Sequence, residues 1–402
     1  MDYETPPAYE PPSREVRRGR ARERRRKRME RAAMVRPAGS RLAKQQLVPA
    51  GALKLPEIRV PETRYLLYAA GALLLVFGIL YVLGQFKGAS APPETPPNGL
   101  WLGTEWTYAL DEAAEVEELV QRLREHRIGT VYAWVSWLKP DMSWGGRRDG
   151  TNEFDEVEPV VKDFVEQFKE LYPESVLYGW ISLPVGPGNH DMGSEDVQQA
   201  VADFSRRTVG ELGFDGVFLN VEPVWNNDTT FLSLLSRVRE TVGSETPISA
   251  AIPPDWSPLG VDVPVPPLIV PGTVWDERYK QSVALIVDEL AVMAYNSGLD
   301  SAPDYSQWVA YQTATYARAL SALDTGAGAG AHVMIGIPTY EAEPPGHDPL
   351  VENIVSATNG VKLGLQEAGD NARYVRGVAI YADWETDETE WAQFMVNWVN
   401  TP

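Results

Sequence analysis

The chain has 402 residues and no cysteine, which excludes disulfides, thiolate metal sites and a cysteine nucleophile. Its four histidines share no ligand spacing, and nothing in the sequence calls for a metal or another cofactor. The formal net charge of −20 is unevenly spread, because residues 1–64 hold 17 basic and 8 acidic residues and the remainder carries −29. So acidic a remainder would repel phosphates, and we expect no nucleic-acid partner for it.

Residues 1–64 are predicted to be a disordered basic tail, because they combine high charge with few large apolar residues. Residues 65–86 form an uncharged apolar run, and about 20 such residues cross a bilayer as a helix. The basic flank puts the N-terminus in the cytoplasm, so we expect a single-pass protein of the cell membrane with an extracytoplasmic C-terminal domain. We expect the basic tail to be attracted to the anionic lipids of this membrane, and a nucleic-acid-binding arm is the weaker alternative. Residues 87–98 are predicted to be a Pro-rich, semi-rigid linker.

Residues 99–402 alternate short apolar runs with amphipathic helical patterns, and we count eight strand–helix units. The predicted strands are 100–108, 129–137, 175–184, 214–223, 247–254, 290–297, 332–341 and 375–384. Predicted helices include 112–126, 154–172, 194–212, 279–290, 305–323 and 388–399. Continuously hydrophobic strands are typical of parallel strands buried on both sides, so the pattern predicts an α/β fold, a (β/α)8 TIM barrel. An open doubly wound sheet is the alternative, but no Gly-rich phosphate loop follows the first strand.

In a (β/α)8 barrel the active site lies at the C-terminal ends of the strands. Carboxylates, amides and aromatic residues gather at these ends, and flat aromatic rings suit stacking on sugar faces. Some of the 13 tryptophans would equally well fill the core. Asp255 and Trp256 follow the fifth strand. The candidate sugar-binding residues are Glu105, Trp134, Trp180, Trp225, Asn296, Tyr340, Glu341, Tyr381, Trp384 and Glu385.

The fourth strand, FDGVFLNVEP at 214–223, carries the most informative pattern. Residues i and i+2 of a strand point to the same side, so Asn220 and Glu222 project together from an otherwise apolar strand. An amide and a carboxylate side by side are costly in a structural strand. We therefore expect the C-terminal end of this strand to be catalytic.

This strand resembles the fourth-strand signature of family 18 glycoside hydrolases, chitinase-like enzymes in which Asp-Gly is followed by two or three aspartates and a glutamate. Glu222 matches the catalytic acid, while Asn220 and Phe218 stand where the family has aspartates. The segment VMAYNS resembles the sixth-strand motif, with Tyr295 at its tyrosine and Asn296 in place of its aspartate. MIGIPTYE and GVAIYADWE resemble the family's seventh and eighth strands. The Asn-x-Glu order is also similar to that of family 85 endo-β-N-acetylglucosaminidases, in which the Asn takes the assisting role.

The resemblance implies hydrolysis of glycans that contain N-acetylhexosamine, by substrate-assisted retention. Glu222 would protonate the glycosidic oxygen and then activate water. Asn220 and Tyr295 would hold the 2-acetamido group. One alternative is a two-carboxylate retaining glycosidase, with Glu222 as acid/base and Glu341 or Glu385 as nucleophile. Two others are a non-catalytic glycan-binding barrel and a scaffold for division or wall synthesis that binds no sugar.

Overall fold

The computed structural model describes residues 96–109, 112–147, 153–255, 272–323, 330–340 and 346–401. All of them belong to one compact unit, Pro93–Pro402. The predicted tail at 1–64, the predicted membrane helix at 65–86 and most of the predicted linker lie outside the described residues. Within the described ranges, no helix is both long enough and apolar enough to cross a membrane.

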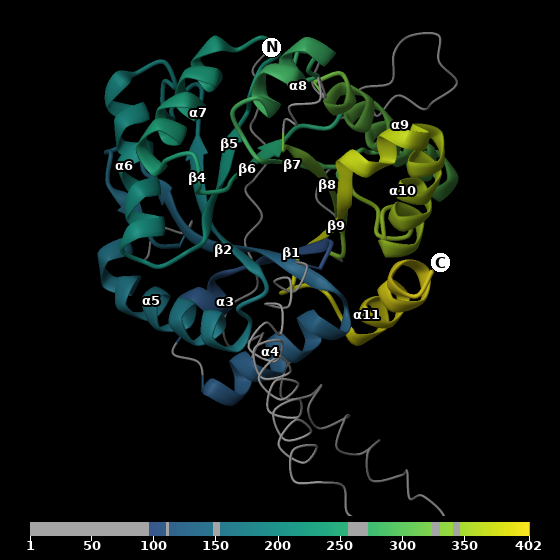
Figure 1. Ribbon diagram of the computed structural model, residues 1–402, viewed down its shortest axis with the longest axis horizontal. Helices are drawn as coiled ribbons and strands as arrows, with labels where there is room; N and C mark the ends of the chain where they lie inside the picture. The colour runs from purple at the N-terminus through teal and green to yellow at the C-terminus, as the bar shows by residue number, and fades with distance from the viewer. Residues whose placement is uncertain are drawn as a thin grey trace, which may run out of the picture. The chain divides into compact units, whose positions relative to one another are not determined.

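Parallel strands close into an eight-stranded barrel in the described part of the chain (Figure 1). In barrel order the strands are β1 (Asn98–Leu102), β2 (Ile128–Leu138), β4 (Val176–Pro184), β5 (Gly216–Glu222), β6 (Ile248–Ile252), β7 (Glu289–Met293), β8 (His332–Pro338) and β9 (Val375–Tyr381). The short β3 (Trp144–Gly145) pairs antiparallel with the end of β2. The fold is therefore the (β/α)8 barrel that the alternating sequence pattern predicts.

Helices lie outside the ring of strands (Figure 1). They are α4 (Ala113–Glu125), α5 (Phe154–Leu171), α6 (Glu195–Gly210), α7 (Thr229–Val242), α8 (Glu277–Ala284), α9 (Ala302–Ser321), α10 (Ile354–Ala368) and α11 (Glu388–Phe394), with the short turns η1 (Gly369–Tyr374) and η2 (Met395–Val399). The α-helices bury one face: in α5 the buried positions include Val157, Val161, Phe164 and Phe168, spaced four and three residues apart as one helix face requires.

The predicted first strand, 100–108, is wrong in its second half. The strand ends at Leu102, and residues Thr104–Thr107 form the short helix α3. The Glu105 carboxylate accepts the Gly103 N–H at 3.2 Å, and the Tyr108 N–H donates to the Thr104 carbonyl at 3.1 Å. The Tyr108 bond closes a helical turn that the sequence pattern does not reveal. The predicted helix at 279–290 is also too long, since α8 ends at Ala284 and β7 begins at Glu289.

The first and last strands meet at one seam of the barrel, through the register pairs Gly99↔Ala379 and Leu100↔Ile380. Indole hydrogen bonds hold this seam at both ends. Trp106 Nε1 donates to Asp383 Oδ2 at 2.8 Å, and Trp398 Nε1 donates to Asn98 Oδ1 at 2.7 Å. The seam therefore joins residues about 300 positions apart in the chain.

Large aromatic side chains fill the interior of the barrel. Trp101 lies 4.7 Å from Tyr132 between ring centroids, and Tyr132 lies 4.6 Å from Phe218. Above them, Trp134 and Trp180 meet edge to face at 5.0 Å. Inward-facing positions alternate along a strand, so on β5 the two inward positions after Phe218 are Asn220 and Glu222. The aromatic layer thus forms a largely apolar floor beneath this polar pair.

Candidate active site

Asn220 and Glu222 lie together at the C-terminal end of β5. Asn220 Nδ2 donates to Glu222 Oε2 at 3.0 Å, so the two side chains share the side that the i, i+2 spacing predicts. Asn220 is 7% exposed, whereas Glu222 is exposed at the rim. The pair therefore reaches from the buried interior of the barrel, at Asn220, to its exposed rim, at Glu222.

The carbonyl oxygen of the Asn220 side chain is buried and has no hydrogen-bond partner among the described residues. Leaving a buried acceptor unsatisfied costs about 1–3 kcal/mol. Because the amide N–H already bonds Glu222, the orientation that satisfies the nitrogen leaves Oδ1 as an unused acceptor. The N–H of a ligand would satisfy this oxygen by donating a hydrogen bond to it.

Tyr295 stands at the same end of the barrel, two residues after β7. Its ring stacks on Tyr381, with centroids 5.1 Å apart and planes at 18°, and meets Tyr340 edge-on at 6.2 Å. Burial raises the pKa of Tyr295 well above its usual value of 10, and the charges of Tyr381, Tyr340 and Glu222 raise it further. The hydroxyl therefore stays protonated as a donor near Glu222.

Two of the predicted sugar-stacking tryptophans lie inside the barrel. Trp134 and Trp180 are only 5% and 6% exposed. Their indole N–H groups donate to the Gly146 carbonyl and to Ser182 Oγ, each at 3.1 Å. Little of either ring face is left for a sugar, and their main contacts are with each other and with the aromatic floor. Trp225, by contrast, is 48% exposed beside the end of β5.

Tyr295, Tyr340 and Tyr381 contact one another and form a tyrosine cluster. The remaining predicted residues lie in this cluster or around it. Tyr340 is buried, Tyr381 and Trp384 are half-buried, and Trp384 meets Tyr381 edge-on at 5.5 Å. Asn296 is exposed next to Tyr295, and Glu385 is half-buried after β9. Glu105 is half-buried and turns back onto Gly103 at the start of α3. Glu341, the nucleophile of the two-carboxylate alternative, lies outside the described residues.

Asp255, expected at the rim after the fifth barrel strand, is instead a buried structural residue. Its Oδ2 accepts from Lys280 Nζ of α8 and from Thr315 Oγ1 of α9, the latter at 2.8 Å. Its backbone carbonyl accepts from Trp308 and Gln312. The residue therefore fixes the end of β6 to two helices rather than facing a substrate.

Sequence reasoning missed Glu352 and His347, which lie fully buried behind the tyrosine cluster. No spacing in the sequence marks them, since they belong to the segment between β8 and α10 and Glu352 bonds residues about 55 positions earlier. The described residues contain no group of three or more His, Asp or Glu that could hold a metal ion.

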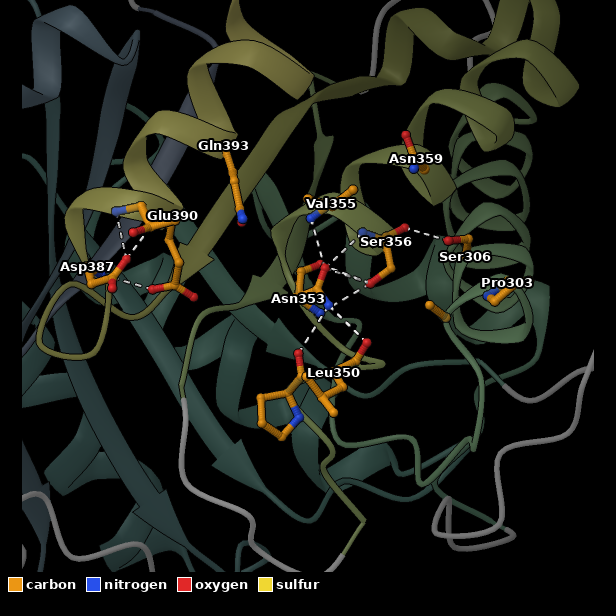
Figure 2. A pocket seen from close by; sticks show the side chains of 13 residues that line it. Pro303, Ser306, Leu350, Asn353, Val355, Ser356, Asn359, Asp387, Glu390 and Gln393 are labelled. Atoms are coloured by element: carbon orange, nitrogen blue, oxygen red, sulfur yellow. Dashed lines mark hydrogen bonds between the residues drawn. The ribbon is translucent and has the colours of Figure 1, made fainter.

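A cavity of about 350 Å³ adjoins the end of β5 and is lined by the loop after β4 together with Pro223, Trp225, Asp228 and Thr230. A larger cavity of about 740 Å³ lies elsewhere, between the first turns of α9, α10 and α11 (Figure 2). Its polar side chains serve the helices themselves: Asn353 Oδ1 accepts from the Val355 and Ser356 N–H groups, and Asp387 caps α11 in the same way. The smaller cavity, whose lining begins at Pro223 directly after β5, is the one placed to extend the candidate site.

The fold and the site together define a (β/α)8 barrel with an amide–carboxylate pair and a tyrosine cluster at the carboxyl ends of its strands. No family model matches the sequence, and no curated protein matches it. Similar solved structures include the spore cortex-lytic enzyme SleL of Bacillus cereus (10% identity, TM-score 0.48, 76% of this chain and 74% of that one). Others are a class V chitinase of Pseudomonas fluorescens (13%, TM-score 0.47, 75% and 99%) and a mutant class V chitinase of Cycas revoluta with (GlcNAc)3 (13%, TM-score 0.49, 75% and 99%). At these values the function is best judged from the residues of the site.

Proposed function

We propose that this chain is a glycoside hydrolase that cleaves glycans containing N-acetylhexosamine by substrate-assisted retention. The observation that carries the proposal is the Asn220–Glu222 pair at the end of β5. The Glu222 carboxylate is exposed and accepts a hydrogen bond from Asn220 Nδ2 at 3.0 Å. The other amide atom, Asn220 Oδ1, is buried and has no hydrogen-bond partner among the described residues. A non-catalytic glycan-binding barrel would need neither the exposed carboxylate nor the unsatisfied amide oxygen.

Each group has a distinct task in the proposed reaction. Glu222 gives its proton to the glycosidic oxygen as the bond from that oxygen to the anomeric carbon breaks. The carbonyl oxygen of the substrate's 2-acetamido group attacks the anomeric carbon and forms a cyclic intermediate. Glu222, now a carboxylate, takes a proton from water, and the resulting hydroxide opens the ring with net retention of configuration.

Asn220 and Tyr295 orient the acetamido group for that attack. Asn220 Oδ1 would accept the acetamido N–H, because it is the unsatisfied acceptor in the site. The neutral hydroxyl of Tyr295 would donate to the acetamido oxygen. A geometry fixed in this way lowers the entropic part of the barrier, since the nucleophile is already in place.

The test compares the full chain with Glu222→Gln on β-linked N-acetylglucosamine oligomers and on their de-N-acetylated counterparts. We expect hydrolysis by the wild type, confined to acetylated substrates, and a loss of about 100-fold or more in Glu222→Gln, since general acid–base catalysis contributes 10²–10⁴-fold. Glu245→Gln, an exposed carboxylate before β6 at the other end of the barrel, is the matched control.

Other outcomes separate the alternatives. Binding of oligomers without turnover supports a glycan-binding barrel, and absence of any binding supports the scaffold. Turnover of de-N-acetylated substrates, together with loss of activity in Glu341→Gln or Glu385→Gln, supports the two-carboxylate scheme.

We also propose that residues 65–86 anchor the chain in the cell membrane with the barrel outside the cytoplasm. The support is the length of the uncharged run and the basic excess before it. Protease added to intact cells should then digest the barrel and leave residues 1–64 protected. Digestion only after lysis would contradict the orientation.

A further inference from the structure

Two His–Glu pairs lie near β7 and β8, one at each end of these strands. At the start of the strands, Glu289 and His332 are register partners, and His332 Nε2 lies 2.8 Å from Glu289 Oε2. Beyond the strand ends, His347 Nδ1 lies 3.1 Å from Glu352 Oε2, and neither of these two side chains has any solvent exposure. The second pair stands behind the tyrosines of the candidate site.

Glu352 fixes the backbone that follows Tyr295. Its carboxylate accepts the Asn296 N–H at 2.6 Å and the Ser297 N–H at 2.7 Å, and also the Ser297 hydroxyl. On the other side of Tyr295, the Tyr305 hydroxyl donates to the Ala294 carbonyl at 2.6 Å. Tyr295 is thus held between two anchored neighbours, and its ring position depends on the carboxylate.

His347 fixes Tyr340 in the same way. Its Nε2 lies 3.0 Å from the Tyr340 carbonyl oxygen, and its ring packs on the Tyr340 ring at 3.9 Å between centroids. One imidazole therefore contacts oxygen atoms through both nitrogens, the Glu352 carboxylate on one side and the Tyr340 carbonyl on the other. Nothing of similar size replaces both contacts.

We propose that His347 and Glu352 are a positioning pair, which holds Tyr295 and Tyr340 at the distance that the acetamido group requires. Neither residue faces the substrate, so both act through the tyrosines. The kinetic part of this inference rests on the proposed function, whereas the structural part does not. Misplacement of a catalytic group by about 1 Å costs on the order of 100-fold in rate.

The kinetic experiment compares His347→Gln with His332→Gln, in the full chain, on N-acetylglucosamine oligomers. Each variant breaks one His–Glu contact near one end of these strands, and the fraction of folded protein is measured for both so that kcat refers to folded enzyme. We expect kcat to fall about 100-fold in His347→Gln with little change in KM, and to stay near the wild-type value in His332→Gln. Equal losses in the two variants would overturn the proposal.

A double-mutant cycle with Tyr295→Phe tests whether the pair acts through this tyrosine. If it does, adding His347→Gln to Tyr295→Phe should lower kcat much less than it does in the wild type, because the same interaction is lost only once. Fully additive losses would contradict it. Ser297→Ala, which removes one donor to Glu352, is the milder variant if His347→Gln does not fold, and it should show the same pattern with a smaller loss.

Amide hydrogen exchange tests the structural part even if the wild type has no hydrolytic activity. The Asn296 and Ser297 amides should be protected in the wild type and in His332→Gln, and should exchange faster in Glu352→Gln, since a Gln amide cannot accept all of the carboxylate's hydrogen bonds. Unchanged protection in Glu352→Gln refutes the positioning pair. Faster exchange in a chain that cleaves no glycan refutes the proposed function alone.

Discussion

Replacing Lys280 by Met should destabilise the barrel strongly, because it would leave the Asp255 carboxylate buried and unpaired. The Lys280 and Asp255 side chains are 6% and 4% exposed, and Lys280 Nζ also lies 4.3 Å from the centroid of the Tyr316 ring. Among the described residues, Thr315 would then be the one remaining donor to the Asp255 carboxylate, and the Oδ1 atom already has no partner there. Removing one partner of a buried pair costs about 3–5 kcal/mol.

The measurement is the free energy of unfolding from urea titrations of the full chain. Arg318→Met is the matched control, because Arg318 of α9 and Glu277 of α8 form an exposed ion pair, with side chains 61% and 50% exposed. We expect the control to change stability by about 0.5 kcal/mol or less. Adding Asp255→Asn to Lys280→Met should recover part of the loss, since the uncompensated charge is gone. A loss below about 1 kcal/mol in Lys280→Met would refute the reasoning from burial.

Three further predictions concern the site and the dependence of stability on pH. Tyr295→Phe should lower kcat on acetylated substrates by roughly 100–1000-fold while leaving the far-ultraviolet spectrum unchanged, as a single lost transition-state hydrogen bond would; an unchanged kcat argues against its donor role. Burial raises the pKa of Tyr172 to about 12, with the Glu174 charge adding, so the folded state keeps a proton that the unfolded state loses near pH 10. Its contribution to stability is complete below about pH 10 and declines above it, which urea midpoints between pH 9 and 11 would check. Burial alone would raise the pKa of Glu289, but hydrogen bonds, the largest from His332, hold it below its usual value. That contribution is present above about pH 4.5 and is lost as the pH falls through the folded pKa, so the urea midpoint of Glu289→Gln should fall less between pH 7 and 3 than that of the wild type.

Much of the fold follows from the sequence because the barrel strands are buried on both faces. Continuous apolar runs such as those at 175–184 and 332–341 mark β4 and β8, and the observed strands lie within them. The first strand was predicted too long because Trp106 of α3 and Tyr108 after it continue its apolar pattern. The spacing of apolar residues cannot show where β1 ends and α3 begins. In the structure, the Gly103 N–H bonds the Glu105 carboxylate at this boundary.

The site was predictable only where its residues are close in sequence. Asn220 and Glu222 share a strand, so a period of two places them together, and the structure shows them hydrogen-bonded. Tyr295 was proposed through a resemblance, and its stacking on Tyr381 depends on strands far apart in the chain. Burial of Trp134 and Trp180 depends on how eight strands converge, which no single strand reveals.

The seam between β1 and β9 has a consequence for synthesis. β1 can pair with β2 early, but its other edge has no strand until β9 is made, and Trp398 bonds Asn98 across 300 residues. At roughly 5–20 residues per second, a ribosome needs about 15–60 s to make that stretch. Throughout this interval the chain holds an unpaired strand edge, so the barrel cannot close until β9 has been made, and early contact with a chaperone would shield that edge.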